Sequence, residues 1–233
     1  MESYVPMKVL VNRRHVFFCL PLLLLSACIG QHSASPVYGG GGGSTWSKVP
    51  TVVFVAPETD PRLQVAREAV DFWNRTFAEL GTPFRLGPIS HTTDTVSIDD
   101  LKALSVQVVG RGGPTALPEH IQRMPGDLIV VLSDGDFISF AARSLSGAKV
   151  LVGIRSHQLY PLTLPNVARN VIAHELGHAI GLGHNDDPTT LMCGRPAPCR
   201  PAAFQSQTER FFPLTNAEKA RLMTMYPPHW QSR

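Results

Sequence analysis

Residues 174–184 read HELGHAIGLGH, and this stretch holds three histidines and one glutamate at regular spacing. His174 and His178 are four residues apart, so on a helix both imidazoles project from the same face, one turn apart. Gly181 can adopt a backbone conformation that is costly for other residues, which lets the chain leave the helix and return through His184. The spacing therefore predicts that the three imidazoles meet around one metal ion.

The predicted ligand set has three members, which indicates a catalytic rather than a structural zinc site. Structural zinc is usually enclosed by four protein ligands, whereas catalytic zinc keeps one position open for water. Glu175 is next to the first histidine, close enough to hydrogen-bond such a water without binding the metal. We therefore predict His174, His178 and His184 as zinc ligands and Glu175 as the general base. The alternative, a polar helix with incidental histidines, does not account for the second glycine and the third histidine.

These residues match the motif HExxHxxGxxH at every fixed position, so the chain resembles the metzincin zinc peptidases. That clan also places a methionine in a tight turn beneath the metal. Met192, in TTLMCG, stands eight residues after His184, a spacing similar to that of the matrixin branch. The stretch LTNAEKARLMTMYP (214–227) resembles the closing helix of matrixin catalytic domains, and the likeness covers roughly residues 50–228.

The resemblance implies a zinc-dependent endopeptidase, with one catalytic ion that activates a water and a protein or peptide as substrate. It also implies that the substrate lies extended along an edge strand of the sheet, and we expect residues 148–156 to supply that edge. Two other functions stay open. One is an envelope-anchored binding or maintenance lipoprotein with this fold and little turnover, and the other is a zinc hydrolase of non-peptide amides.

The sequence departs from the matrixin pattern close to the metal. Asn185 stands where serine or threonine usually follows the third histidine, and Cys193-Gly194 stands where tyrosine and proline usually follow the methionine. The tyrosine with which the astacin and serralysin branches assist catalysis is missing at that spacing. These differences indicate an outlying, bacterial-type relative of the matrixins and leave the wall of the substrate site unassigned.

Apolar patterning predicts a mixed α/β fold, and the resemblance to metzincins implies their α+β arrangement. It consists of a twisted mixed sheet, an active-site helix and a C-terminal helix within residues 49–233. The first helix is expected over 59–81, the second begins near Asn166, and the third begins at Thr215, which fits a capping box with Glu218. The expected strands are 51–56, 83–89, 105–110, 127–134 and 148–156.

The N-terminus has the layout of a secretory signal. Basic residues precede an apolar run, Val16–Leu25, which is too short for a comfortable transmembrane helix. The following Leu25-Ser26-Ala27-Cys28 resembles the lipobox of bacterial lipoproteins, in which the cysteine is lipidated and begins the mature chain. An ordinary signal peptide cut nearby is the alternative. Residues 1–27 are therefore the expected signal peptide.

The glycine-rich residues 28–48 are the expected flexible linker, since they cannot bury apolar surface. This layout predicts a domain that a lipid on Cys28 anchors in the cell envelope, outside the cytoplasm. Ile29 favours the outer membrane, because the retention signal of such lipoproteins is usually an aspartate at this position.

Two further features bear on cofactors and partners. Cys193 and Cys199 are expected to form a disulfide in an oxidising compartment, with two free thiols as the alternative. The turn Asp134-Gly135-Asp136 offers carboxylates to calcium, although a solvated turn is the favoured interpretation. Without residues 1–27 the chain has 18 basic and 17 acidic residues and no basic patch, which argues against nucleic acid as a partner.

Overall fold

The computed structural model describes residues 45–111, 113–194 and 199–233. The predicted signal peptide, Cys28 and most of the predicted linker lie outside these residues. Across the described ranges, no helix combines the length and the apolar character needed to cross a bilayer.

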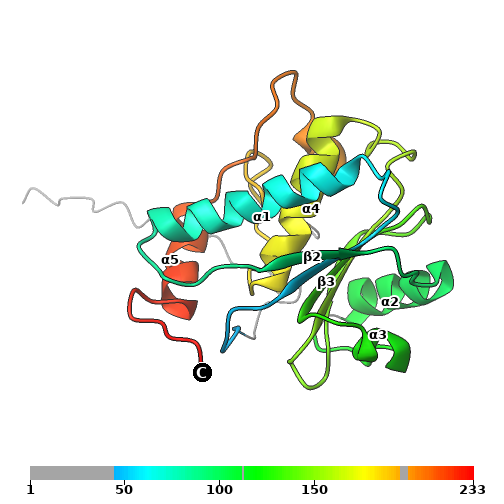
Figure 1. The fold of residues 1–233 in the computed structure, drawn as a ribbon. Coiled ribbons are helices and arrows are strands. Elements are labelled where there is room, and N and C mark those ends of the chain that lie inside the picture. The colour runs from blue at the N-terminus through cyan, green and yellow to red at the C-terminus, as the bar shows by residue number, and fades with distance from the viewer. Residues whose placement is uncertain (1–44, 112, 195–198) are drawn as a thin grey trace, which may run out of the picture. The chain divides into compact units, whose positions relative to one another are not determined.

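Five strands form one mixed sheet in the order β2-β1-β3-β5-β4 (Figure 1). Neighbouring strands pair in parallel except at one edge, where β4 runs antiparallel to β5. The strands are β1 (Val52–Val55), β2 (Ile89–Thr92), β3 (Leu128–Leu132), β4 (Phe140–Arg143) and β5 (Val150–Ile154). The predicted mixed sheet with helices is confirmed.

The edge strand differs from the expected one. β5 lies between β3 and β4, and all five of its residues are buried, so the expectation that residues 148–156 form the edge is wrong. The two edges are β2 and β4, and the short sequence of β4, FAAR, lacks the β-branched residues by which strands are recognised. β4 packs against α4 (Pro165–Ala179), the helix that carries His174 and His178.

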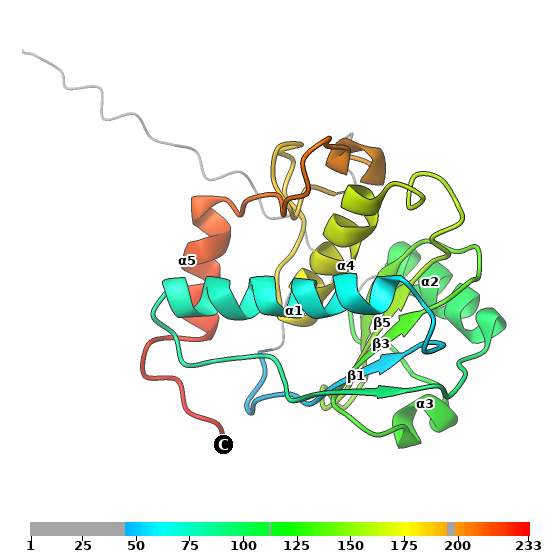
Figure 2. The ribbon, with the colours of Figure 1, turned by 45° about the horizontal axis from the view of Figure 1, so that its top comes forward.

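Helices cover both faces of the sheet (Figures 1 and 2). One face packs against α1 (Arg62–Glu79) and α4 (Pro165–Ala179), and the other against α2 (Ile98–Arg111) and α3 (Glu119–Arg123). The last helix, α5 (Asn216–Met225), lies beside the end of α1, where the rings of Phe77 and Tyr226 are 5.5 Å apart. α4 contacts both the sheet and α1.

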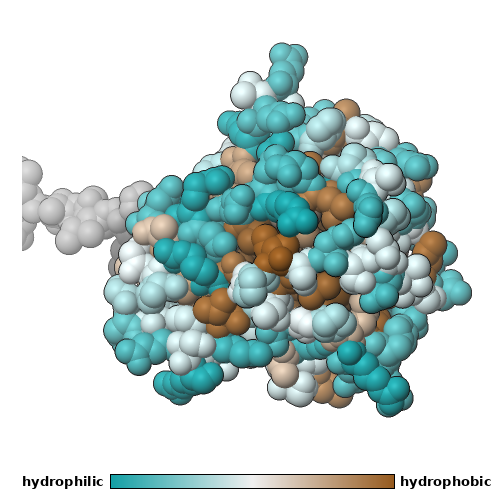
Figure 3. Space-filling view, viewed as in Figure 1, coloured by the Kyte–Doolittle hydropathy of each residue, from teal (hydrophilic) through white to brown (hydrophobic). Residues whose placement is uncertain are grey.

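Side chains that alternate along the strands separate the core into two clusters. In β1, Val52 and Phe54 face α1 and α4, whereas Val53 and Val55 face α2. Trp46 belongs to the first cluster, so the folded domain begins before residue 49. On the surface drawn in Figure 3, hydrophilic residues surround a central hydrophobic area near α1 and β2.

Two of the expected strands differ in the structure. Residues 105–110 belong to α2, and of residues 83–89 only Ile89 lies in a strand. In α2 the buried residues Leu101 and Leu104 have helical spacing, whereas Val106 and Val109 are 75% and 47% exposed. Burial of the two leucines on the sheet thus outweighs the strand preference of the valines.

The predicted capping box at the start of α5 is present. The hydroxyl of Thr215 accepts the amide of Glu218, and the Glu218 carboxylate accepts the amide of Thr215. We predict that Thr215→Ala lowers the free energy of unfolding by about 1 kcal/mol, measured by urea denaturation. Thr224→Ala, at an exposed site in the same helix, is the control and should change it by less than about 0.5 kcal/mol. Equal losses in both variants would contradict the assignment.

Candidate metal centre

Three imidazoles meet at one point beside α4. His174 and His178 lie one turn apart on the helix, and His184 returns to them from the following loop. Their Nε2 atoms are separated by 3.1 Å (His174–His178), 3.2 Å (His174–His184) and 2.9 Å (His178–His184). Tetrahedral nitrogen ligands of zinc, each about 2.05 Å from the ion, lie about 3.3 Å apart. The cluster therefore has nearly the dimensions of three zinc ligands.

The protons of two of the rings are fixed by the backbone. Nδ1 of His174 donates to the carbonyl of Leu191 (2.7 Å), and Nδ1 of His178 donates to the carbonyl of Leu182 (2.9 Å). In a neutral ring whose Nδ1 carries the proton, Nε2 has only a lone pair. The two Nε2 atoms therefore repel each other unless a cation lies between them. This arrangement fits a metal ion.

Burial keeps these imidazoles neutral. Desolvation and the neighbouring His184 lower the pKa of His174 to about 4, and desolvation together with the other two rings puts the pKa of His178 well below its usual value. Neutral imidazole is the form that binds metal, so both rings are ready at neutral pH. Burial also raises the pKa of Glu175 to about 8. A cation nearby would favour the ionised carboxylate.

Met192 lies beneath the cluster, against the helix turn that carries the first two histidines. A Cβ atom on Gly177 would be 2.4 Å from Sδ of Met192 and 3.0 Å from the Trp73 ring. Met192 is fully buried, and the indole of Trp73 also donates to the carbonyl of Ala173 (2.9 Å), next to His174. Because Gly177 has no side chain, Met192 and Trp73 can pack directly against the backbone of α4 at this position.

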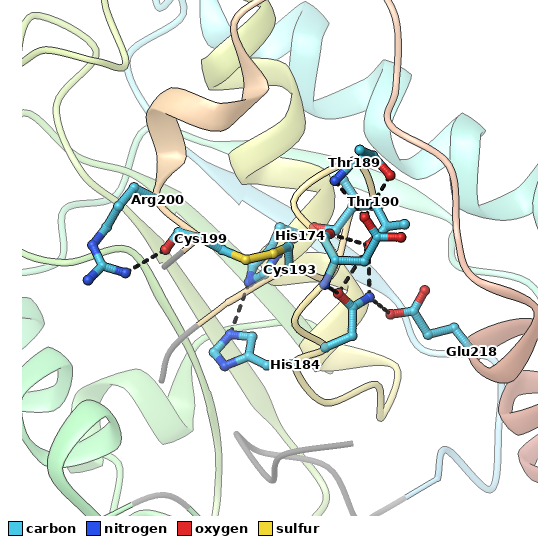
Figure 4. Close-up of a disulfide and its surroundings, with 11 residues drawn as sticks. His174, His184, Thr189, Thr190, Cys193, Cys199, Arg200 and Glu218 are labelled. Atoms are coloured by element: carbon cyan, nitrogen blue, oxygen red, sulfur yellow. Dashed lines mark hydrogen bonds between the residues drawn. A yellow bond between two sulfur atoms is a disulfide. The ribbon is translucent and has the colours of Figure 1, made fainter. Parts of the chain in front are cut away.

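The loop that follows Met192 turns back onto the third histidine. The amide of Asn185 donates to the carbonyl of Met192 (2.9 Å), and the amide of Gly194 donates to the carbonyl of Asn185 (3.1 Å). Cys193 and Cys199 form a disulfide with Cα atoms 5.6 Å apart, which Figure 4 shows together with His174 and His184. The departures from the matrixin pattern at positions 193 and 194 are therefore part of the cluster's surroundings.

Asn185, the other departure from that pattern, connects the cluster to the closing helix. Its side-chain amide donates to Oε1 of Glu218 (2.6 Å) and to the hydroxyl of Thr190 (2.8 Å). Glu218 is 3% exposed, and burial raises the pKa of its carboxyl group. The residue after His184 is therefore fixed by the same glutamate that caps α5.

Two asparagines on α4 continue the stripe of the helical histidines, a role that was not assigned to them from the sequence. Asn166 and Asn170 precede His174 and His178 at intervals of four residues, so all four side chains lie along one stripe of the helix. Asn166 binds the amide of Arg210 and the carbonyl of Phe204, and Asn170 binds the carbonyl of Arg210 and the amide of Phe212. In the sequence, this role is indicated by polar residues that continue the four-residue spacing of the histidines towards the N-terminus of the helix.

The turn Asp134-Gly135-Asp136, in which calcium was the less favoured alternative, has arginine partners. Asp134 lies 3.7 Å from the guanidinium of Arg62, and Asp136 lies 2.8 Å from that of Arg155. In the ranges that the structure describes, the three histidines are the only group of three or more side chains able to hold a metal ion.

Comparisons with known proteins give a distant structural likeness. No protein-family model matches the sequence, and no curated protein matches it. Archaemetzincin from Methanopyrus kandleri is 17% identical, with a TM-score of 0.46 over 77% of this chain and 96% of its own. A zinc-dependent peptidase from Methanocorpusculum labreanum is 15% identical (TM-score 0.37, 73% and 99%), and myroilysin is 11% identical (TM-score 0.41, 84% and 92%). At this distance, the function has to be argued from the site itself.

We predict that Gly194→Ala weakens metal binding. A Cβ atom there would lie 2.2 to 2.5 Å from three atoms of the His184 ring, so the ring must move. The backbone of Gly194 is outside the positive-φ region, so alanine meets no conformational strain. Zinc affinity, measured by competition with a chelator, should fall at least about tenfold.

Gly110→Ala is the matched control, because a Cβ atom there has no neighbour within 4 Å and the residue also lacks a positive φ. Its zinc affinity should equal that of the parent chain. A parental affinity in Gly194→Ala would show that His184 is not held as described.

Proposed function

We propose that this chain is a zinc-dependent endopeptidase of the metzincin type, with His174, His178 and His184 as ligands. The observation that carries the proposal is the convergence of three Nε2 atoms within 3.2 Å, two of them in rings whose protons are fixed on Nδ1. Three ligands leave a zinc position open for water and substrate. The buried carboxyl group of Glu175 supplies the proton acceptor that hydrolysis needs.

The roles of the residues follow from this arrangement. Zinc, when bound, supplies Lewis acidity and a water of lowered pKa. Glu175 takes the proton of the attacking water and passes it to the leaving amine. Met192 supports the helix turn between the first two ligands through its contact with Gly177. Its spacing from His184 favours a matrixin-like branch of the clan, with Asn185 and Cys193 as this chain's own variations.

The substrate site in this proposal runs along β4. The amide of Ser144 donates to the carbonyl of Lys149, so this is a hydrogen-bonded pair of the two strands. By alternation, the backbone N–H and C=O groups of Ala142 and Phe140 also point towards β5, whereas those of Ala141 and Arg143 point away from it. The carbonyl of Arg143 accepts the amide of Thr115 (2.7 Å). Within β4, Ala141 is therefore the position at which an extended peptide would pair with the edge.

We also propose that the chain is a lipoprotein. The support is the sequence alone: a basic N-terminal region, the apolar run Val16–Leu25 and the small residues before Cys28. Lipid on Cys28 would place the peptidase domain on the outer membrane, outside the cytoplasm, and the glycine-rich residues between Cys28 and Trp46 would give it reach.

The proposed activity predicts that Glu175→Gln keeps its zinc and loses peptide hydrolysis. The amide is of equal size but cannot accept the proton, so cleavage of casein and of a peptide mixture should fall about 10²- to 10⁴-fold. Zinc content is measured in parallel by elemental analysis. The exposed Glu119, which pairs with Arg123, provides the control Glu119→Gln, which should remain fully active.

The same assay separates the proposed function from its rivals. Cleavage by the parent chain that stops with a chelator and returns with zinc supports a metallopeptidase. A parent chain that binds zinc and cleaves no peptide would favour a binding protein or an amide hydrolase of another class. Undiminished cleavage by Glu175→Gln would refute the assigned mechanism.

The proposed anchor predicts a change in detergent partitioning. The chain expressed in a bacterium with lipoprotein processing should enter the detergent phase of Triton X-114, and Cys28→Ala should move it to the aqueous phase, because the lipid is lost. Cys19→Ala, within the apolar run, is the matched control and should partition like the parent. Equal partitioning of Cys28→Ala and parent would argue for an ordinary signal peptide.

A further inference from the structure

Consecutive backbone carbonyls after His178 all accept hydrogen bonds from side chains. The last carbonyls of a helix have no partner within the helix, and water or a cap usually satisfies them. Here the acceptors are residues 179 to 182, which form the turn between the second and third histidines. Their donors are Trp46 and Arg143 for Ala179, Tyr226 for Ile180, Arg221 for Gly181 and His178 for Leu182.

The three donors to Ala179 and Ile180 come from distant parts of the chain. Trp46 precedes β1, Arg143 ends β4, and Tyr226 follows α5. The carbonyl of Ala179 accepts Nε1 of Trp46 at 3.0 Å and Nη2 of Arg143 at 2.8 Å, and the carbonyl of Ile180 accepts the hydroxyl of Tyr226 at 2.9 Å. The C-terminal end of α4 is thus tied to both ends of the domain and to the edge strand.

The three donors also hold one another. The guanidinium of Arg143 lies over the ring of Trp46, 4.8 Å from its centroid, and also donates to the carbonyl of Gly147 (3.1 Å). The hydroxyl of Tyr226 accepts the amide of Trp46 (3.3 Å) while it donates to Ile180. Burial raises the pKa of Tyr226 to about 12, so this hydroxyl keeps its proton. A cation at a helix C-terminus also interacts favourably with the helix dipole.

We infer that Trp46, Arg143 and Tyr226 are positioning residues of the metal centre. They hold the two carbonyls that follow His178, and thereby fix the turn through which the chain reaches His184. Zinc affinity is consequently set in part by side chains that do not touch the ion. We call these three side chains the clamp. Because Arg143 belongs to the edge strand β4, the clamp also connects the proposed substrate strand to the metal ligands. This inference rests on the proposed function, since it concerns the same ion.

The test replaces each donor in the full chain, with Tyr226→Phe, Trp46→Phe and Arg143→Met. Zinc dissociation constants are measured by competition with a chelator, and the absorption bands of the cobalt-substituted chain report ligand geometry. Each variant should bind zinc about tenfold more weakly, by analogy with residues that orient metal ligands, and should shift the cobalt bands. Arg143→Lys, which keeps a donor, should recover part of the affinity.

Two matched controls remove comparable groups elsewhere. Tyr160→Phe removes a hydroxyl from an exposed tyrosine that binds Gln205, and Arg85→Met removes a guanidinium that binds the carbonyls of Thr82 and Phe84. Both should keep the parental zinc affinity and cobalt spectrum.

Urea unfolding of the metal-free chains separates positioning from simple stabilisation. If the clamp only stabilises the fold, the unfolding midpoint falls while the zinc affinity and cobalt bands of the folded variants equal those of the parent, and the inference is overturned. If Arg143→Met does not fold, the test rests on Tyr226→Phe, which removes only one oxygen atom and is therefore expected to fold. A parent chain that binds no zinc would instead overturn the proposed function, and this inference with it.

Discussion

The two hydrogen bonds from imidazole Nδ1 atoms to backbone carbonyls determine the chemistry of this molecule. They fix the tautomers of His174 and His178, and so direct the Nε2 lone pairs of both rings to one point. The acceptor of the first, Leu191, is itself held where its amide donates to the carbonyl of Pro213 (2.9 Å). The acceptor of the second, Leu182, donates its own amide to the carbonyl of Gly177 (2.9 Å). The loops around α4 therefore orient the ligands, and the helix alone would not.

The fold supports this arrangement by enclosing α4 on several sides. The sheet lies on one side and α1 on another, and Leu191 and Met192, from the loop after His184, pack in the same core cluster. Twelve of the fifteen residues of α4 are buried, including Asn166 and Asn170, whose amides bind segment 204–212. A buried polar side chain is tolerated only when its hydrogen bonds are satisfied, and these asparagines meet that condition through backbone partners. The same packing explains why burial can hold the two helical histidines neutral and ready for a metal ion.

Short sequence patterns predicted local structure well, but they could not predict contacts between segments that are far apart in the sequence. Three features involve only residues close together in the sequence: the histidine spacing, the turn at Gly181 and the capping box of Thr215 and Glu218. The structure contains each of them. The edge strand was assigned wrongly because strand order depends on which segments meet, and FAAR carries no strand signal of its own. Residues 105–110 were assigned wrongly because their valines prefer strands, while the burial of Leu101 and Leu104 decides the conformation. Trp46 and Arg143, which donate to the carbonyl of Ala179, are each more than thirty residues away from it in the sequence, and no periodicity reveals such contacts.

A consequence for stability follows from the geometry of the cluster. Without a cation, the Nε2 lone pairs of His174 and His178 face one another, and the surrounding packing has to compensate the cost of holding them together. A bound cation removes this repulsion only in the folded state, because the unfolded chain does not bring the three rings together. Binding to the folded state alone adds about 2.7 kcal/mol at a metal concentration one hundred times the dissociation constant. The loop from Gly181 to Met192 gains most from this linkage, because it contributes His184 and both carbonyls that orient the helical ligands. The metal centre is therefore both the site of the proposed chemistry and a part of the structure that holds this loop in place.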